Sequence, residues 1–255
     1  MPSPKPTDDP LVFPFDEFPR EYHAGVSVLS HVGQHIVEVT GRFRLPDIPP
    51  NVRTVGDQTA FWVGISGGSV VSQLVQAGVD VRVVEDGLHI RPFMEWIPDP
   101  PDYSPVMPAL APGHVIEITI RLQDSWHATV TFRDLGDPSG TPYEVTGFSR
   151  FNWRLQQPMM GVYAEWMVEP AIFVKDSERY RSIHPLANFG EVVFTHCSAT
   201  TNKGNKLDLS ESNGRGIRNL DKSKIADTEV DIGSGQGISG FTVRHKGHAK
   251  SSEYN

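Results

Sequence analysis

The stretch that decides the fold begins at Trp62 and ends at Pro98, and it reads WVGISGGSVVSQLVQAGVDVRVVEDGLHIRPFMEWIP. Within it, residues 74–80 follow the two-residue period of a β-strand. One side of that strand carries small apolar side chains that suit a core: Val75, Ala77 and Val79. The other side carries an amide, a bare backbone and a carboxylate: Gln76, Gly78 and Asp80. We interpret this polar side as a floor on which a ligand lies, although the pattern is also typical of an ordinary half-exposed strand.

A second stretch, Tyr163–Glu169, has the same division into two faces. The face that suits a core carries Ala164, Trp166 and Val168. The opposite face carries Tyr163, Glu165, Met167 and Glu169. Both stretches therefore predict a strand with one apolar and one functional or solvated face.

The rest of the chain indicates an all-β fold. His35–Leu45 alternates between apolar and polar residues, and Val115–Phe132 has the pattern of a hairpin. No run of ten or more residues has helical periodicity, and we expect at most one short helical turn, within Glu169–Tyr180. Many strands at a spacing of 8–12 residues predict a β-sandwich or barrel.

The chain contains no internal repeat and no linker, so we expect one domain, at residues 21–248. The Pro- and Asp-rich residues 1–20 are expected to be loose, and residues 249–255 to form a disordered tail. The Pro-rich loop Ile97–Pro112 cannot hold a strand ladder, and we expect it to hang over the ligand face.

Four motifs occur in a fixed order along the chain. They are W-V-G-I-x-G from Trp62, L-x-Q-x-G-V-D from Leu74, E-W-x-P from Glu95 and A-E-W-x-x-E from Ala164, followed by P-L-A-N-F-G-E-V-V-F-T. In order and spacing, this set resembles the glutamic peptidases, or eqolisins, which are acid endopeptidases with a Gln/Glu dyad. The resemblance extends from about Ala24 to Thr200, and more loosely to the C-terminus.

The resemblance implies a two-sheet antiparallel β-sandwich of the lectin/glucanase, concanavalin A-like type, with a ligand cleft on its concave sheet. It implies that Glu165 activates a water as general base and acid, and that Gln76 binds that water and the developing oxyanion. Such chemistry uses no metal and no cofactor. The residues that the resemblance assigns to substrate binding are Trp62, Gly78, Asp80, Phe93, Glu95, Ser66 and His23.

Some of these positions depart from the family pattern. Ser66 stands where Asp is usual, and His23 stands where a Trp is usual before the small-residue pair. Phe93 and Met94 replace aromatic residues beside the E-W pair, which leaves a less stacking surface. A peptide is therefore one expected ligand. The alternative is a non-peptidase relative that uses the same cleft to bind, or to do acid–base chemistry on, a small hydrophobic molecule or a glycan.

Composition limits the partners and the compartment. The net charge of −8 disfavours nucleic acid and anionic membranes, and no segment approaches the length of an apolar membrane span. The one cysteine, Cys197, is expected to be a buried thiol, and the ten histidines to be scattered surface residues rather than metal ligands. The lack of a signal peptide, of a glycosylation sequon and of a possible disulfide favours an intracellular protein, unlike the usually secreted family. The oligomeric state is not indicated.

The balance of charges also bears on pH. The chain has 23 Lys and Arg and 10 His against 31 Asp and Glu, so its net charge becomes strongly positive when the carboxylates are protonated. We therefore expect it to work at mildly acidic to neutral pH, unlike the acid-active family that it resembles.

Overall fold

The computed structural model describes residues 11–14, 23–67, 73–97, 99–103, 109–136, 143–149, 158–170, 172–175, 180–183, 185–222 and 226–247. Almost all of these residues lie in strands or in the turns between them, and the helical elements among them are two single 3-10 turns, η2 (Pro50–Val52) and η3 (Glu211–Asn213). No helix of this described part is long and apolar enough to cross a membrane.

The candidate site lies on a sheet that has six strands within the described residues. Its order is β15 (Gly216–Arg218), β2 (Ala24–Leu29), β10 (Tyr163–Pro170), β4 (Gln58–Ser66), β5 (Leu74–Val84) and β6 (Gly87–Ile97). Every neighbouring pair is antiparallel. The two stretches singled out in the sequence, Leu74–Val84 and Tyr163–Pro170, thus lie on either side of β4.

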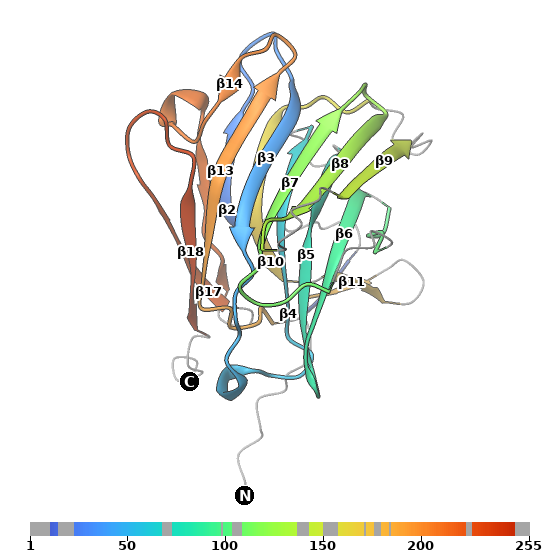
Figure 1. Ribbon diagram of the computed structural model, residues 1–255, viewed down its shortest axis with the longest axis vertical. Coiled ribbons are helices and arrows are strands. Elements are labelled where there is room, and N and C mark those ends of the chain that lie inside the picture. Colours follow the sequence, from blue (N-terminus) through green and yellow to red (C-terminus); the bar gives the residue numbers. More distant parts are fainter. Residues whose placement is uncertain are drawn as a thin grey trace, which may run out of the picture.

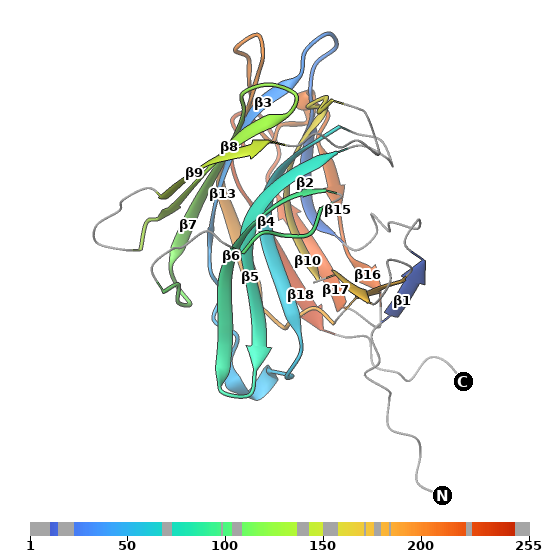
Figure 2. The same ribbon diagram turned by 90° about the vertical axis from the view of Figure 1, so that its right-hand side faces the viewer.

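A second antiparallel sheet covers one face of the first (Figures 1 and 2). Its path among the described residues is β16 (Asp221–Lys222), β17 (Ala226–Ile232), β18 (Phe241–Gly247), β13 (Glu191–Thr201), β3 (Ile36–Arg44), β7 (Val115–Leu122), β8 (His127–Asp134) and β9 (Tyr143–Ser149), with β14 (Lys206–Leu207) on β13. A small third sheet joins β1 (Leu11–Pro14), β12 (Tyr180–Ile183) and β11 (Ile172–Lys175). The predicted two-sheet β-sandwich is confirmed.

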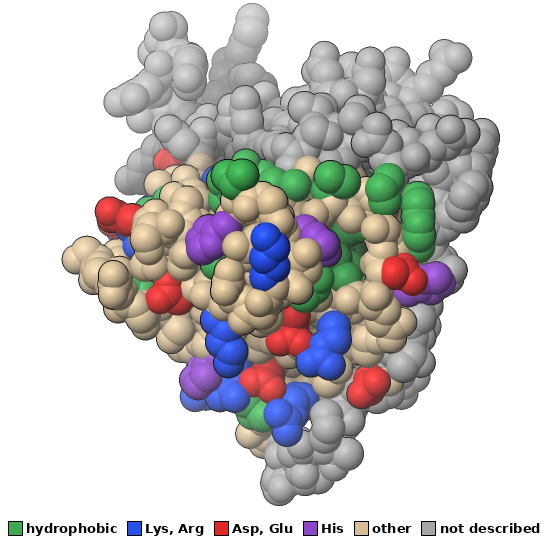
Figure 3. Space-filling model, turned by 90° about the horizontal axis from the view of Figure 1, so that it is seen from above, with side chains coloured by type: hydrophobic (Ala, Val, Ile, Leu, Met, Phe, Trp, Pro, Cys, Tyr) green, Lys and Arg blue, Asp and Glu red, His purple; other side chains and the backbone are tan. Residues whose placement is uncertain are grey.

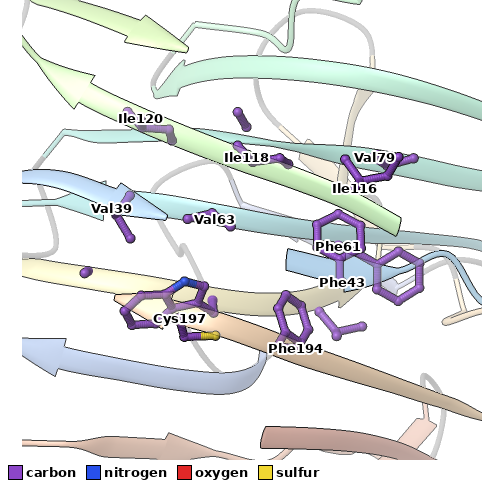
Figure 4. Packing of buried hydrophobic residues seen from close by; sticks show 14 of the residues in the cluster. Val39, Phe43, Phe61, Val63, Val79, Ile116, Ile118, Ile120, Phe194 and Cys197 are labelled. Carbon is purple, nitrogen blue, oxygen red and sulfur yellow. The ribbon is translucent and has the colours of Figure 1, made fainter. Parts of the chain in front are cut away.

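The hydrophobic core fills the space between the two large sheets (Figure 4). Phe61 of β4 and Phe43 of β3 meet across it with ring centroids 5.9 Å apart, and the rings of Phe194 and Phe241 stack at 4.8 Å. Trp166 reaches from β10 into the second sheet, where its indole N–H donates to the carbonyl of Thr40 at 2.9 Å. These contacts fix which face of β4, β5 and β10 is turned away from the core.

The strands that carry the site are more buried than their alternation suggests. Every residue of β4 is buried, and so are nearly all residues of β5, on both faces. The interpretation of these stretches as ordinary half-exposed strands is therefore wrong, because a second, smaller apolar cluster covers the face opposite the core: Ala60, Trp62, Leu74, Phe93 and Met167.

Two local expectations change in the structure. The residues Ile172–Lys175, inside the segment expected to hold a short helical turn, form strand β11, and residues 176–179 lie outside the described residues. Leu11–Pro14, inside the segment expected to be loose, pair with β12. The remainder of residues 1–20 and the tail 249–255 lie outside the described residues, as does Pro98 of the E-W-x-P motif.

One end of the sandwich carries the β2–β3 and β13–β14 turns, and histidine, basic and acidic side chains are interspersed on it (Figure 3). His31 and His35 are exposed in the turn between β2 and β3. The His31 imidazole is 3.3 Å from the Oδ1 of Asn213, and the backbone N–H of His35 donates to Asn202. These two histidines agree with the predicted surface positions.

Candidate active site

The register of the six-stranded sheet brings the predicted dyad into one transverse row. Ser27 of β2 pairs with Glu165 of β10, Glu165 with Gly64 of β4, Gly64 with Gln76 of β5, and Gln76 with Glu95 of β6. Residues directly opposite each other in neighbouring strands point to the same face. The Glu165 and Gln76 side chains therefore rise from the same face of the sheet, the face away from the main core.

Gly64 keeps the position between the two dyad residues free of a side chain. A Cβ placed on it would lie 2.9 Å from the Trp62 ring and 3.0 Å from Cδ1 of Leu74. With β10 and β5 two strand spacings apart, roughly 10 Å of backbone separates Glu165 from Gln76. Two extended side chains can bracket a small molecule over that distance, while the Trp62 ring and Leu74 approach the position that lacks a side chain.

The Glu165 carboxylate is buried and held by two polar groups. Its residue is only 5 % exposed. The hydroxyl of Ser66 donates to Oε1 at 2.9 Å, and a guanidinium nitrogen of Arg218 lies 3.8 Å from Oε2. Ser66 was predicted at this site from its motif, and the structure places it beside Glu165, where it fixes the orientation of the carboxylate.

The Gln76 amide is held from the opposite side. Its Nε2 donates to Oε2 of Glu95 at 2.5 Å, and the residue is 2 % exposed. Its Oε1 is buried and has no hydrogen-bond partner within the described residues. Leaving such an acceptor unsatisfied is unfavourable, so this oxygen is suited to receive a hydrogen from a bound molecule.

The row next to the dyad is apolar. Met167, Trp62, Gly78 and Phe93 pair in turn across β10, β4, β5 and β6. The Trp62 side chain is fully buried, and its indole Nε1 has no hydrogen-bond partner among the described residues. Trp62 and Phe93, two of the residues that the resemblance assigned to substrate binding, thus form an apolar wall beside the dyad.

Gly78 lies in that row, but it does not form an open floor. A Cβ on Gly78 would stand 2.3 Å from the Phe61 carbonyl oxygen, 2.7 Å from the Trp62 Cβ and 2.8 Å from Cε1 of Phe93. The space above the glycine is therefore occupied by the protein itself. The expectation of a bare surface is wrong, because Phe93 packs from β6 onto the position that lacks a side chain.

Asp80 lies one row further on and belongs to a separate polar group. Gln58 donates to its Oδ1 at 2.5 Å, and Arg91 donates to its Oδ2 at 3.1 Å. Burial raises the pKa of the Asp80 carboxyl, and the bonds from Gln58 and Arg91 oppose that rise. The residues directly opposite Glu165 are Ser27 and Gly64, and Asp80 lies two rows away. The Asp80 and Glu165 carboxylates are therefore not neighbours, as the two carboxylates of a glycosidase are.

The first residues of the Pro-rich loop reach this polar group. Asp102 forms a β-bridge with Met94 of β6, and the guanidinium of Arg91 lies 4.0 Å from the centre of the Tyr103 ring. The Tyr103 and Phe93 rings are 6.4 Å apart, and burial raises the pKa of the Tyr103 hydroxyl to about 12. This part of the loop therefore packs beside the apolar row, and residues 104–108 lie outside the described residues.

His23 is buried, in contrast to the surface position expected of the histidines. It is 4 % exposed, its Nε2 lies 2.7 Å from the Glu169 carboxylate, and its ring packs edge-on against Trp62 with centroids 5.6 Å apart. The position that is usually a Trp in the resembled family thus still supplies an aromatic ring next to Trp62.

Among the described residues, no group of three His, Cys, Asp or Glu is placed to hold a metal ion. Cys197 is a free, buried thiol, and burial raises its pKa well above the usual range, so the prediction of a buried cysteine is confirmed.

Two residues near Glu165 were missed by sequence reasoning, Arg218 and Ser27. Arg218 lies on β15, a three-residue edge strand in a polar stretch that has no recognisable motif. A strand this short has no measurable alternation, and only its pairing with β2 reveals which way its side chains point.

Comparison with known proteins agrees with this fold. The model of the peptidase A4 family matches residues 21–239, which is most of the chain. The chain is similar to aspergillopepsin-2 of Aspergillus niger, at 24 % identity over 229 residues, 83 % of this chain and 76 % of that protein.

Among solved structures, the fold matches scytalido-glutamic peptidase bound to a peptide-based transition-state analogue, with a TM-score of 0.71, 18 % identity, and 89 % and 98 % of the two chains covered. It also matches SCP-B, an eqolisin family member in complex with the tripeptide Ala-Ile-His, with a TM-score of 0.67, 16 % identity and the same coverage.

Proposed function

Because this chain belongs to the peptidase A4 family, the eqolisins, we propose that it cleaves internal peptide bonds with Glu165 and Gln76 as its catalytic dyad. Membership in the family makes it a hydrolase of the glutamic-peptidase type. The observation that carries the assignment of the dyad is the transverse row in which Glu165 and Gln76 flank the side-chain-free Gly64. The fold and the burial of both residues support it.

In the proposed reaction, a water lies between the side chains of Glu165 and Gln76. The unsatisfied Oε1 of Gln76 accepts one of its hydrogens, and the Glu165 carboxylate accepts the other. As Glu165 takes that proton, the water oxygen bonds to the carbonyl carbon of the peptide, and the carbonyl oxygen becomes an oxyanion.

The oxyanion then accepts a hydrogen bond from the Gln76 amide nitrogen. That nitrogen carries two hydrogens and donates only one of them to Glu95. Glu165 next gives its proton to the amide nitrogen of the substrate, the C–N bond breaks, and the carboxylate is restored. Ser66 supports both steps by holding Oε1 of Glu165 in place.

The assignment is tested by incubating the protein with a denatured protein substrate from pH 2 to 7 and detecting fragments by mass spectrometry. Glu165→Gln removes the general acid and base, and we expect a loss of at least about 10²-fold in kcat. Gln76→Ala removes the oxyanion donor, with an expected loss of about 10²–10³-fold. Neither change is expected to alter the melting temperature greatly.

Glu191→Gln is the control, because it removes an exposed carboxylate from β13 of the second sheet, which carries no residue of the dyad row. We expect it to keep most of the activity. Cleavage that survives both dyad substitutions would rule out the assignment. The alternative function, binding of or acid–base chemistry on a small hydrophobic molecule or glycan, predicts no peptide fragments at any pH.

A further inference from the structure

A polar cluster lies beside Glu165 on the side away from Gln76. It consists of Ser27 of β2 and of Gly216 and Arg218 of β15, and we call it the β15 cluster. Gly216 pairs with Ser27, which pairs with Glu165, and Arg218 pairs with Gly25 in the next row. The register therefore extends the dyad row by two positions, up to the edge strand.

Two glycines shape the β15 cluster. Gly25 carries no side chain between Arg218 and Met167, so the arginine can extend across β2 to within 3.8 Å of Glu165. Gly216 leaves the end of the dyad row without a side chain, and the nearest atom to a Cβ built there is the Ser27 hydroxyl oxygen, at 2.9 Å. The Ser27 hydroxyl thus leans over Gly216, toward the strand that carries Arg218.

The two polar side chains of the β15 cluster, Ser27 and Arg218, have spare hydrogen-bonding capacity. Ser27 is 4 % exposed, and its hydroxyl makes no hydrogen bond within the part of the chain that the structure describes. Arg218 is 27 % exposed at its side chain, and its long contact with Glu165 is its one polar contact among those residues. A guanidinium offers five N–H donors, so most of them are available to a ligand.

The geometry points to a site at the β15 cluster for a carboxylate of the substrate, next to the scissile bond. A hydroxyl and a guanidinium are hydrogen-bond donors that match the two oxygens of a carboxylate, and Arg is the side chain best suited to bind it. The two possible sources are an Asp or Glu side chain near the cleaved bond and the α-carboxylate at the C-terminus of the peptide.

The described charges around the dyad are mostly negative, so an anionic ligand depends on Arg218. Besides Glu165, the described face carries the carboxylates of Glu95, Asp80 and Glu169, and Asp80 already has Arg91 as its partner. Arg218 is the cation next to Glu165, so it can offset the repulsion between Glu165 and an anionic substrate. This inference rests on the proposed peptidase function and adds a preference for the substrate.

The experiment compares kcat/KM for matched peptides. One pair places Glu or Gln at each position beside the scissile bond, and a second pair has a free or an amidated C-terminus. We expect the wild-type kcat/KM to be about tenfold higher for one of the carboxylate-bearing peptides than for its neutral counterpart. A single charge-assisted hydrogen bond at a partly exposed site provides a difference of about this size. The pair that shows the preference identifies the source of the carboxylate.

Arg218→Gln should reduce that ratio to about one, mainly through KM, and Arg218→Lys should restore part of it. Arg82→Gln is the control for loss of a positive charge, because Arg82 is exposed on β5, six residues or roughly 20 Å along the strand from Gln76, and should keep the wild-type ratio. The ratio is independent of any general loss of activity in a variant.

Equal cleavage of both members of each pair by the wild-type protein would overturn the assignment of the β15 cluster as a carboxylate site, while the proposed peptidase function would stand. An unchanged ratio in Arg218→Gln would overturn it as well. A failure of the wild-type protein to cleave any peptide would instead contradict the proposed function, and this inference with it.

Discussion

Replacement of Gly78 by alanine tests the packing beside the dyad. The new methyl group would lie 2.3 Å from the Phe61 carbonyl oxygen and 2.7 Å from the Trp62 Cβ, and neither of these atoms can move without shifting a central strand. The third neighbour, the Phe93 ring at 2.8 Å, could move only by leaving the apolar row. Both kinds of adjustment are unfavourable.

The size of the effect follows from these contacts. Adding a methyl group to a well-packed interior typically costs about 1–3 kcal/mol of unfolding free energy. Because two of the three close atoms belong to the backbone or lie next to it, we expect at least about 2 kcal/mol. For a chain of this size, that loss lowers the melting temperature by roughly 4–8 °C.

The assay is a thermal melt together with a urea titration, in which the midpoint should fall while the m-value stays unchanged. Gly233→Ala is the matched control, because no atom lies within 4 Å of a Cβ built at Gly233. That control should be neutral or slightly stabilising, by less than about 1 kcal/mol. A Gly78→Ala protein as stable as the wild type would refute the reasoning, and would return this position to the open floor that the sequence suggested.

Two further predictions concern pH. Partial burial of Glu117 raises its pKa, but hydrogen bonds and ion pairs with Arg42 and Arg133 outweigh this effect and hold the pKa below the usual 4.5. The ionised Glu117 therefore stabilises the fold above pH 4.5, and this stabilisation is lost as the pH falls through the lowered pKa. Glu117→Gln should therefore reduce stability at pH 7 by about 1–2 kcal/mol and reduce the acid dependence measured in urea titrations; equal losses at pH 7 and pH 3 would contradict this. For the whole protein, we expect maximal activity at mildly acidic to neutral pH, checked by paired profiles of folding and cleavage, and a protein that is folded and most active at pH 2–3 would overturn that expectation.

The sequence alone determined the class of fold and the identity of the dyad candidates. Alternation in Leu74–Val84 and Tyr163–Pro170 follows from the geometry of a strand, in which successive side chains point to opposite faces. It therefore assigned Val75 and Trp166 to the core, and Gln76 and Glu165 to the other face, before any tertiary contact was known. The ordered motifs supplied the family, which local periodicity alone does not give.

The sequence could not determine how buried that other face is. The alternating sequence pattern is the same whether the second face of a strand contacts water or an apolar cluster, because burial depends on segments that are distant in the chain. Trp62, Phe93 and Met167 come from three different strands and cover the face together. For the same reason, Gly78 was interpreted as open space when it is the position onto which Phe93 packs.

Only the tertiary structure decided the neighbours of Glu165. Ser66 and Arg218 are 99 and 53 positions from it in sequence, and antiparallel pairing through β4 and β2 brings them to its two oxygens. The register of a sheet is set by the summed packing of its buried face, and a shift by one residue would turn every side chain to the other side. The sequence thus supplied the reactive groups, while the register selected which of them meet.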